Sequence, residues 1–147
     1  MRNRDMAADY LQEAEVSLKQ AELALELRRY NTAVRRAQDC LEFSIKAALR
    51  LVGIEYPKEH EVSDVLRSAS ERFPKWFRAE IDRIARASAT LIPKRGLATY
   101  GDERRFTPAG ELFDRDDALE AMDDARKSFE KVKLLLRSFE KASKKQR

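Results

Sequence analysis

The sequence predicts an all-α protein, an up-and-down helical bundle of four to five helices in a single domain over residues 1–147. Three observations predict this class. Apolar residues recur at alternating steps of four and three, which is the spacing of one helix face. No segment alternates apolar and polar residues with the period of two that a half-buried strand requires. Glycine and proline are sparse, with four of each in 147 residues, so few breaks interrupt the helices.

Two helices are predicted in the N-terminal third of the chain. The first, over about residues 5–27, carries one apolar stripe: Ala7, Leu11, Ala14, Leu18, Ala21 and Leu25. The second follows Asn31, which suits an N-cap, and carries a similar stripe: Val34, Ala37, Leu41, Ile45, Ala48 and Val52. Cys40 falls on its apolar side and is expected to pack as a small hydrophobic residue. Gly53 suits the position after the helix end.

A short amphipathic pattern over residues 61–73 predicts a third helix. Pro74 suits the first turn of a fourth, since that turn needs no N–H donor, and Pro93 stops it. The stripe of this fourth helix is Phe77, Ile81, Ile84, Ser88 and Leu91. Residues 94–113 contain three of the four glycines and are predicted to form an irregular loop. Loops longer than about 12–15 residues are uncommon unless they are functional or disordered.

The last helix has the clearest pattern. Asp114 suits its N-cap, and Asp116 and Asp117 suit the positive end of the helix dipole. Its stripe is Ala118, Met122, Ala125, Phe129, Val132, Leu136 and Phe139. Residues 141–147 are predicted to form a frayed basic tail. The net charge of +4 arises from residue 137 onward, whereas a sequence-independent nucleic-acid binder spreads its charge over a face. The pattern favours a solvated tail with weak phosphate affinity.

Several functional classes are disfavoured by the composition. The single cysteine has no second thiol for a disulfide or a thiolate metal site. No apolar run reaches the roughly 18 residues of a membrane span, and no signal-peptide stretch follows the N-terminus. We therefore expect a soluble, cytoplasmic protein without membrane attachment. No phosphate-binding loop is present, and the carboxylates of residues 114–124 spread around their helix. No cofactor and no metal site are predicted.

The candidate site is the polar stretch KRGLATYGDERRF at residues 94–106. Five of its residues are candidates for binding a nucleotide, RNA or a protein partner: Arg95, Tyr100, Asp102, Glu103 and Arg104. An arginine binds phosphate with two hydrogen bonds, a tyrosine stacks on a base, and carboxylates accept from ribose or hold a cation. In the alternative interpretation, Asp102 caps a turn around Gly101, Tyr100 packs on the core and the arginines pair with the carboxylates.

Three further residues are secondary candidates. Glu42 and Lys46, four apart in the favourable order, are expected to pair on a helix surface; the alternative is that they face the cleft of a dimer. His60 is interpreted first as a residue at a helix start, with a ligand or catalytic role as the alternative. It is the only histidine in the sequence, so no second imidazole is present to complete such a site.

Several segments resemble the HEPN domain (higher eukaryotes and prokaryotes nucleotide-binding). YLQEAEVSLKQAELALELRRYNTAVRRAQDCLEFSIKAAL resembles the first two helices of that family, including Tyr30, Ala37-Gln38 and Glu42 with Lys46. GIEYPKEHEVSDVL is similar to its link into the third helix, and ATYGDERRFTPAGELFDRDDALEAMDDAR to the archaeal and bacterial form of its closing loop and last helix. The resemblance implies an all-α bundle, usually a homodimer. Many members are metal-independent ribonucleases, often toxins paired with a small nucleotidyltransferase, and others are binding partners.

The nuclease signature of that family is an arginine followed, after four to six residues, by a histidine. Arg95 stands where the arginine is expected, but the positions for the histidine hold Tyr100, Gly101 and Asp102. Tyrosine titrates near 10 and aspartate near 4, so neither exchanges protons readily at neutral pH. The sequence therefore favours a non-enzymatic homodimer that binds a nucleotidyltransferase, RNA or a nucleotide. The alternatives are a ribonuclease using Arg95 and Tyr100 from both chains, and a structural dimer without nucleotide affinity.

Overall fold

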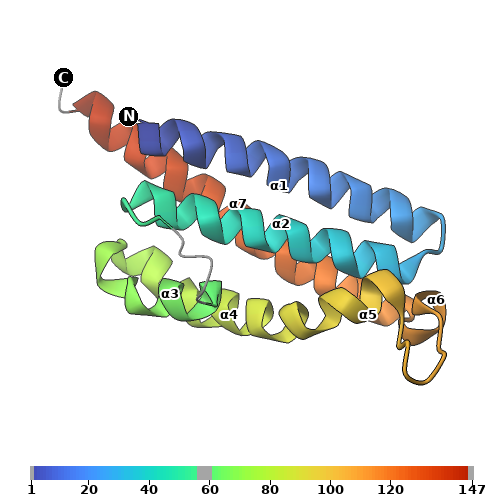
Figure 1. The fold of residues 1–147 in the computed structure, drawn as a ribbon. Helices are drawn as coiled ribbons and strands as arrows, with labels where there is room; N and C mark the ends of the chain where they lie inside the picture. Colours follow the sequence, from blue (N-terminus) through green and yellow to red (C-terminus); the bar gives the residue numbers. More distant parts are fainter. Residues whose placement is uncertain (1, 56–60, 146–147) are drawn as a thin grey trace.

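The computed structural model describes residues 2–55 and 61–145, and the chain in these ranges is helical almost throughout (Figure 1). The four long helices are α1 (Arg2–Glu26), α2 (Tyr30–Leu51), α4 (Lys75–Leu91) and α7 (Arg115–Lys145). The shorter ones are α3 (Val62–Ser68), α5 (Arg95–Tyr100) and α6 (Ala109–Leu112), with 3₁₀ turns at Ser70–Arg72 and Ile92–Lys94. The described ranges contain no strand, and their one isolated bridge joins Asp102 to Thr107. The predicted all-α class is confirmed.

The helices run alternately up and down, with both ends of the chain at the same end of the bundle (Figure 1). Helix α2 is central, because it packs against α1 and α7 and also contacts α3, α4, α5 and α6. Helices α3 and α4 lie on the side of α2 away from α1, and α5 and α6 lie at the end opposite the termini (Figure 1). Within the described ranges, no helix is long and apolar enough to cross a membrane.

The core consists mainly of the predicted apolar stripes, together with Leu49, Phe73 and Leu135, which were not part of those stripes. The largest fully buried side chains are Phe73, Phe77, Leu41, Ile45, Leu49, Leu66, Ile84 and Leu135. Full burial of one such side chain stabilises the fold by about 1.5–3 kcal/mol. On α1 the stripe is buried up to Ala21, while Leu25 packs against the core partly exposed. On α7 the stripe is buried as far as Val132, and Leu136 and Phe139 cover the edge of the core.

The turn between α1 and α2 differs from the predicted one. The N-cap of α2 is Arg29, without a side-chain cap, and Asn31 lies inside the helix. A Schellman motif ends α1 instead: the Arg28 N–H donates to the carbonyl of Leu25 (3.0 Å) and the Arg29 N–H to that of Ala24 (2.9 Å). Arg28 has a φ of 59°, the left-handed conformation that this motif requires. Backbone bonds thus close the turn, and the Asn31 side chain is available for another contact.

The segment 94–113, predicted to be an irregular loop, contains two short helices. Helices α5 and α6 frame a turn that we call the finger, residues 101–108 (Figure 1). Ala98 of α5 and Ala109 of α6 are buried against the bundle, which holds both helices in place. The prediction failed here because each helix is too short to show an apolar period. The predicted frayed tail also differs, since α7 continues to Lys145.

Candidate functional site

One face of α2 is polar where it meets α5. Asn31, Arg35, Gln38 and Glu42 follow at helical spacing on this face. The Asn31 side-chain amide donates to the carbonyl of Ala98 at 3.1 Å, a contact between residues 67 apart in sequence. This bond satisfies a carbonyl near the C-terminal end of α5 that has no partner within the helix. The buried Oδ1 of Asn31 and Nε of Arg35 have no hydrogen-bond partner in the described part of the chain.

A cavity of about 160 Å³ opens beside this polar face. Its apolar wall is formed by Leu41, Val62 and Ile92, and its polar wall by Gln38, Glu42, Ser88 and Arg95. A protein cavity of about 150 Å³ lined by apolar side chains accepts benzene, so this volume suits one six-membered ring. Both apolar contact and polar groups are therefore available to a small ring compound.

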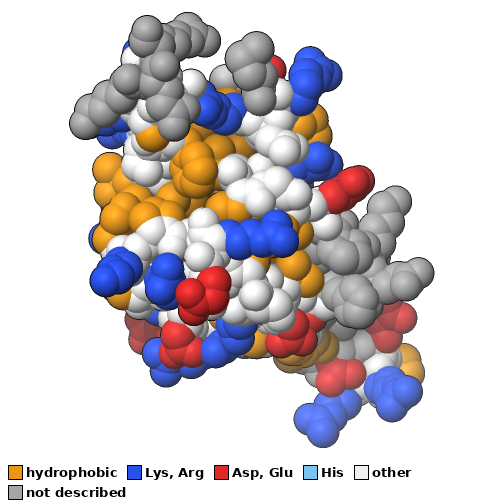
Figure 2. All heavy atoms as spheres, turned by 90° about the vertical axis from the view of Figure 1, so that its left-hand side faces the viewer, with side chains coloured by type: hydrophobic (Ala, Val, Ile, Leu, Met, Phe, Trp, Pro, Cys, Tyr) orange, Lys and Arg blue, Asp and Glu red, His pale blue; other side chains and the backbone are white. Residues whose placement is uncertain are grey.

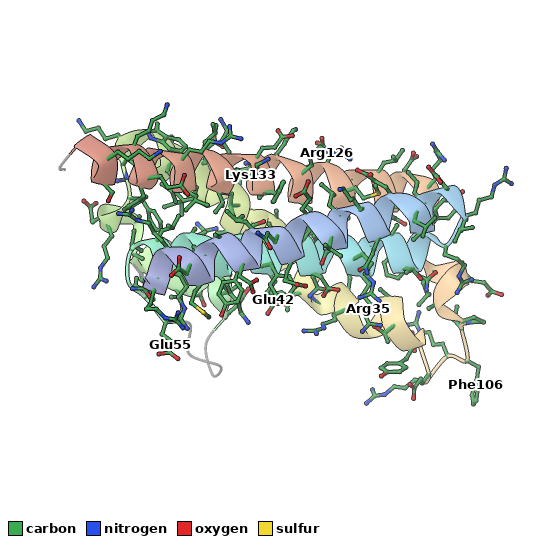
Figure 3. All side chains as sticks on the ribbon, turned by 90° about the horizontal axis from the view of Figure 1, so that it is seen from above. Arg35, Glu42, Glu55, Phe106, Arg126 and Lys133 are labelled. Carbon is green, nitrogen blue, oxygen red and sulfur yellow. The ribbon has the colours of Figure 1, made fainter. Side chains whose placement is uncertain are left out.

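Arg95 stands at the rim of this cavity in a chain of charges. Its Nη1 lies 4.0 Å from Oε2 of Glu42, and Oε1 of Glu42 lies 3.8 Å from Nζ of Lys46. The Arg95 side chain is 58% exposed. Ion pairs this exposed contribute about 0–1 kcal/mol, so an anionic ligand can displace Glu42 from Arg95 at little cost. Figure 3 shows Glu42 and Arg35 on the side of α2 near α5.

The finger has a conformation that only glycine allows at its first residue. Gly101 has φ 80° and ψ −170°, and a Cβ there would lie 2.4 Å from the Thr107 carbonyl oxygen. Asp102 and Thr107 then pair through two backbone bonds of 2.9 and 3.0 Å. Oδ1 of Asp102 accepts the Arg105 N–H at 3.2 Å, and its Oδ2 lies 3.8 Å from Nε of Arg105. The Asp102 carboxylate therefore organises the turn.

The candidates from the sequence fall into two groups. Glu42 and Arg95 line the cavity, and Lys46 is paired with Glu42. Tyr100, which is 74% exposed and not packed in the core, borders two shallow hollows together with Asp102 and Glu103. One hollow, of about 470 Å³, also includes Arg104, Gly96, Leu97, Gly101 and Pro93. His60 lies outside the described residues.

Sequence reasoning missed several residues of the two groups. Gln38 was noted only within the family pattern and Ser88 only as part of a core stripe, yet both line the cavity. The signal was present for α2, because polar residues at positions 31, 35, 38 and 42 follow helical spacing. No signal marked Phe106, which the structure leaves 92% exposed at the finger.

The groups with altered pKa values line neither the cavity nor the hollows at the finger. Burial raises the pKa of the Cys40 thiol to about 12. Burial, followed by the charges of Glu120 and Asp123, raises the pKa of Asp124. A hydrogen bond from Arg83 lowers the pKa of Glu80. Among the described residues, no group of three His, Cys, Asp or Glu side chains is arranged to bind a metal.

The surface at the other end of the bundle carries charges of both signs. Figure 2 shows that end, where Lys and Arg side chains alternate with Asp and Glu around patches of hydrophobic side chains. Phosphate binders that ignore sequence usually present one basic face. The charges visible at that end do not form such a face.

Comparison with known proteins assigns the family. The sequence model of the HEPN domain matches residues 7–135. The crystal structure of TT1696 from Thermus thermophilus is similar, with a TM-score of 0.62 and 25% sequence identity, covering 86% of this chain and 95% of that chain. No curated protein matches. Because the HEPN match spans nearly the whole bundle, from α1 to α7, the chain belongs to the HEPN domain family.

Proposed function

We propose that this chain is a HEPN module that binds a nucleotide or RNA without cleaving it. In this proposal it acts as a homodimer and as the partner of a small nucleotidyltransferase, in a pair of the toxin–antitoxin kind. The observation that carries the proposal is the ring-sized cavity with Arg95 at its rim. A nucleotide needs these two elements side by side, because it joins a flat base to a phosphate.

The cavity lining suits a base and its sugar phosphate. Leu41, Val62 and Ile92 supply apolar contact for a base, and the Gln38 amide both donates and accepts at a base edge. Arg95 offers two parallel N–H donors to a phosphate. Glu42, released from Arg95, accepts from ribose hydroxyls while it keeps its pairing with Lys46.

The site geometry favours binding over cleavage. Arg95 and Tyr100 are five positions apart on α5, which turns them about 140° from each other around the helix axis. One chain therefore does not direct both side chains at a single phosphate. The carboxylate of Asp102, at the last position where the signature histidine is expected, is engaged by the backbone and side chain of Arg105. Proton transfer at neutral pH needs a group that titrates there, and histidine is the usual one.

Thermal unfolding with ATP, GTP and a single-stranded RNA oligonucleotide tests binding. A ligand at 100 times its Kd stabilises the native state by about 2.7 kcal/mol, so the melting temperature must rise. Arg95→Ala removes a charge-assisted contact and is expected to weaken binding roughly 10-fold or more. Arg86→Ala is the matched control, since Arg86 is an exposed arginine in an ion pair with Asp82. Unchanged melting with every ligand would instead support a structural dimer without nucleotide affinity.

Exposed apolar side chains on α1 support the homodimer. Val16 and Leu23, which are 49% and 56% exposed, share the face of α1 opposite the core, and Leu27, which directly follows the helix, is 66% exposed. Such a stripe on a surface helix is typical of a protein contact. Light scattering is expected to give twice the 17.0 kDa chain mass, and a single-chain mass at high concentration would contradict the dimer. Co-expression with the nucleotidyltransferase encoded beside this chain, if there is one, followed by purification of the complex tests the pairing.

A ribonuclease is the second candidate, favoured by the exposure of Tyr100. Its ring is 74% exposed at the end of α5, where the Arg95 of a second chain can approach it. This candidate predicts that purified protein cleaves tRNA or mRNA without added metal and that Arg95→Ala abolishes cleavage. That result would show that the protein is a ribonuclease and would refute the proposal of a module that binds without cleaving. Intact RNA after prolonged incubation, together with nucleotide binding, would support the module.

A further inference from the structure

Neither the packing of the core nor the conformation of the turn explains why residue 106 is a phenylalanine. Its side chain is 92% exposed, and its backbone φ of 52° is in the left-handed region. A bulky residue at positive φ is an outlier, and this position favours glycine or asparagine. Figure 3 shows the Phe106 side chain at the far end of the finger, directed away from the bundle. The fold would be satisfied by a small polar residue here, so the aromatic ring points to a binding role.

Hydrogen bonds brace the backbone that carries the Phe106 ring. Both backbone bonds between Asp102 and Thr107 brace its base, and the Phe106 N–H donates to the Glu103 carbonyl at 3.4 Å across its tip. Gly101, in a conformation that a side chain would block, fixes the angle at which the finger leaves α5. A braced turn loses little backbone freedom when its aromatic ring binds, which favours affinity.

Phe106 shares a hollow with a second exposed ring. Tyr100, Phe106 and Pro108 border a hollow of about 420 Å³, which Asp102, Glu103 and Thr107 complete. The two rings are not stacked on each other in the described structure, so their faces are available. Beside them, Arg104 and Arg105 are exposed, and the Asp102 carboxylate is engaged within the turn. Aromatic faces beside arginines are the surface that single-stranded nucleic acids use.

The cavity beside Arg95 and the two hollows are lined in part by the same stretch of the chain. Ile92 lines that cavity, its neighbour Pro93 lines the hollow of about 470 Å³, and Tyr100 borders both this hollow and the one at Phe106. Three separate concave surfaces are therefore distributed along residues 92–108. A mononucleotide would fill only the first of them.

We infer that Tyr100 and Phe106 form an aromatic subsite that stacks a second base of a single-stranded RNA, whose neighbouring nucleotide lies at the Arg95 cavity. This inference deepens the proposed function and rests on it. It specifies the ligand as an oligonucleotide of at least two residues, with Arg104 contacting the phosphate between them. It also explains the conformation of the finger, and the exposure of Phe106, by a role in ligand binding.

The test compares AMP with a tetra-adenylate by titration. The wild type is expected to bind the longer ligand more tightly, and Phe106→Gly is expected to remove roughly 5-fold to 150-fold of its affinity while leaving AMP binding unchanged. Glycine suits the positive φ, so the melting temperature is expected to stay the same or rise. Arg28→Gly is the matched control, because Arg28 has the other positive φ among described non-glycine residues, at 59°, and carries no ring.

The outcomes separate the subsite from the cavity. If Phe106→Gly leaves the tetra-adenylate affinity unchanged, the subsite is refuted while AMP binding that depends on Arg95 still supports the proposed function. If Arg95→Ala leaves AMP binding intact while Phe106→Gly lowers the affinity for the tetra-adenylate, the role of the cavity in nucleotide binding is refuted and the stacking role of the two rings is supported. If neither ligand binds the wild type, both fail. A change from two-chain to one-chain mass in Phe106→Gly, with RNA affinity retained, would assign the ring to a contact between chains.

Discussion

Substitution of Gly101 by alanine probes the conformation on which the finger depends. The alanine Cβ would lie 2.4 Å from the Thr107 carbonyl oxygen, 2.7 Å from the Ala109 nitrogen and 3.0 Å from the Pro108 carbonyl carbon. All three are backbone atoms, so no side chain can rotate to relieve the contact. In addition, φ 80° with ψ −170° belongs to a region populated almost only by glycine.

The close contacts and the unfavourable backbone conformation both lower the free energy of unfolding of this variant. Backbone strain in this region costs about 1–3 kcal/mol, and the displaced backbone of the finger adds to it, for a total of about 2–4 kcal/mol. For a chain of this size each kcal/mol lowers the melting temperature by about 2–4 °C. Gly101→Ala is therefore expected to lower the melting temperature by roughly 4–16 °C.

Gly96→Ala is the matched control within the same segment. Apart from its chain neighbours and the backbone of its own helix, no described atom lies within 4 Å of the position that its Cβ would take, and Gly96 is inside helix α5. Alanine in a helix is more stable than glycine by about 0.5–1 kcal/mol, so this variant is expected to melt slightly higher. The two variants add the same methyl group five residues apart and are predicted to shift stability in opposite directions.

Circular dichroism melting curves measure the global effect, and hydrogen exchange at the amides of Asp102 and Thr107 measures the local one. If the finger opens before the bundle, exchange at these two amides accelerates even where the melting temperature changes little. The reasoning is refuted if Gly101→Ala melts with the wild type and both amides keep their protection. It is also refuted if Gly96→Ala is the more damaging of the two.

Three further predictions concern the bundle. Because burial raises the pKa of Cys40 to about 12, its thiol should resist iodoacetamide at mildly alkaline pH until denaturant is added; rapid native alkylation would contradict this. Asn31→Ala removes the bond to the Ala98 carbonyl and should cost about 1 kcal/mol in urea unfolding, whereas an unchanged midpoint would show that this bond does not hold α5. The pKa of Asp124 is raised by burial and then by the charge of Glu120. Above that raised pKa the carboxylate is ionised in the folded protein, and this lowers the free energy of unfolding. Below the unfolded value of about 3.8 the group is protonated in both states, so the loss of stability is absent. Asp124→Asn should therefore stabilise the fold at neutral pH, and the gain should disappear on acidification; a pH-independent gain would refute the assignment.

Much of the helical framework was predictable, because the signal is local. The stripes of α1, α2 and α7 repeat over many turns, and each turn adds evidence for the same buried face. Gly53 after α2 was predicted correctly: its φ is 77°, and the Ile54 N–H bonds the Leu49 carbonyl as a Schellman motif requires. Helices α5 and α6 were missed because one or two turns present too few residues for a period.

The candidate site was predictable only in its residue types. Arg95 and Tyr100 were identified from the sequence, but the cavity that Arg95 borders also needs Gln38, Ser88 and Val62, which come from three separate helices. Phe106 looked like an ordinary apolar residue, since exposure is a property of the folded turn. No local pattern states that a backbone will take positive φ at a phenylalanine.

The sequence by itself determined the long helices, which face of each is apolar, and that the chain resembles the HEPN family. These properties depend on neighbours three and four residues apart, which share one side of a helix whatever the rest of the chain does. Only the tertiary structure decided that the polar face of α2 closes on α5 through Asn31 and Ala98, and that the finger extends Phe106 into solvent. Such contacts join residues far apart in the chain, so they exist only after the helices have packed.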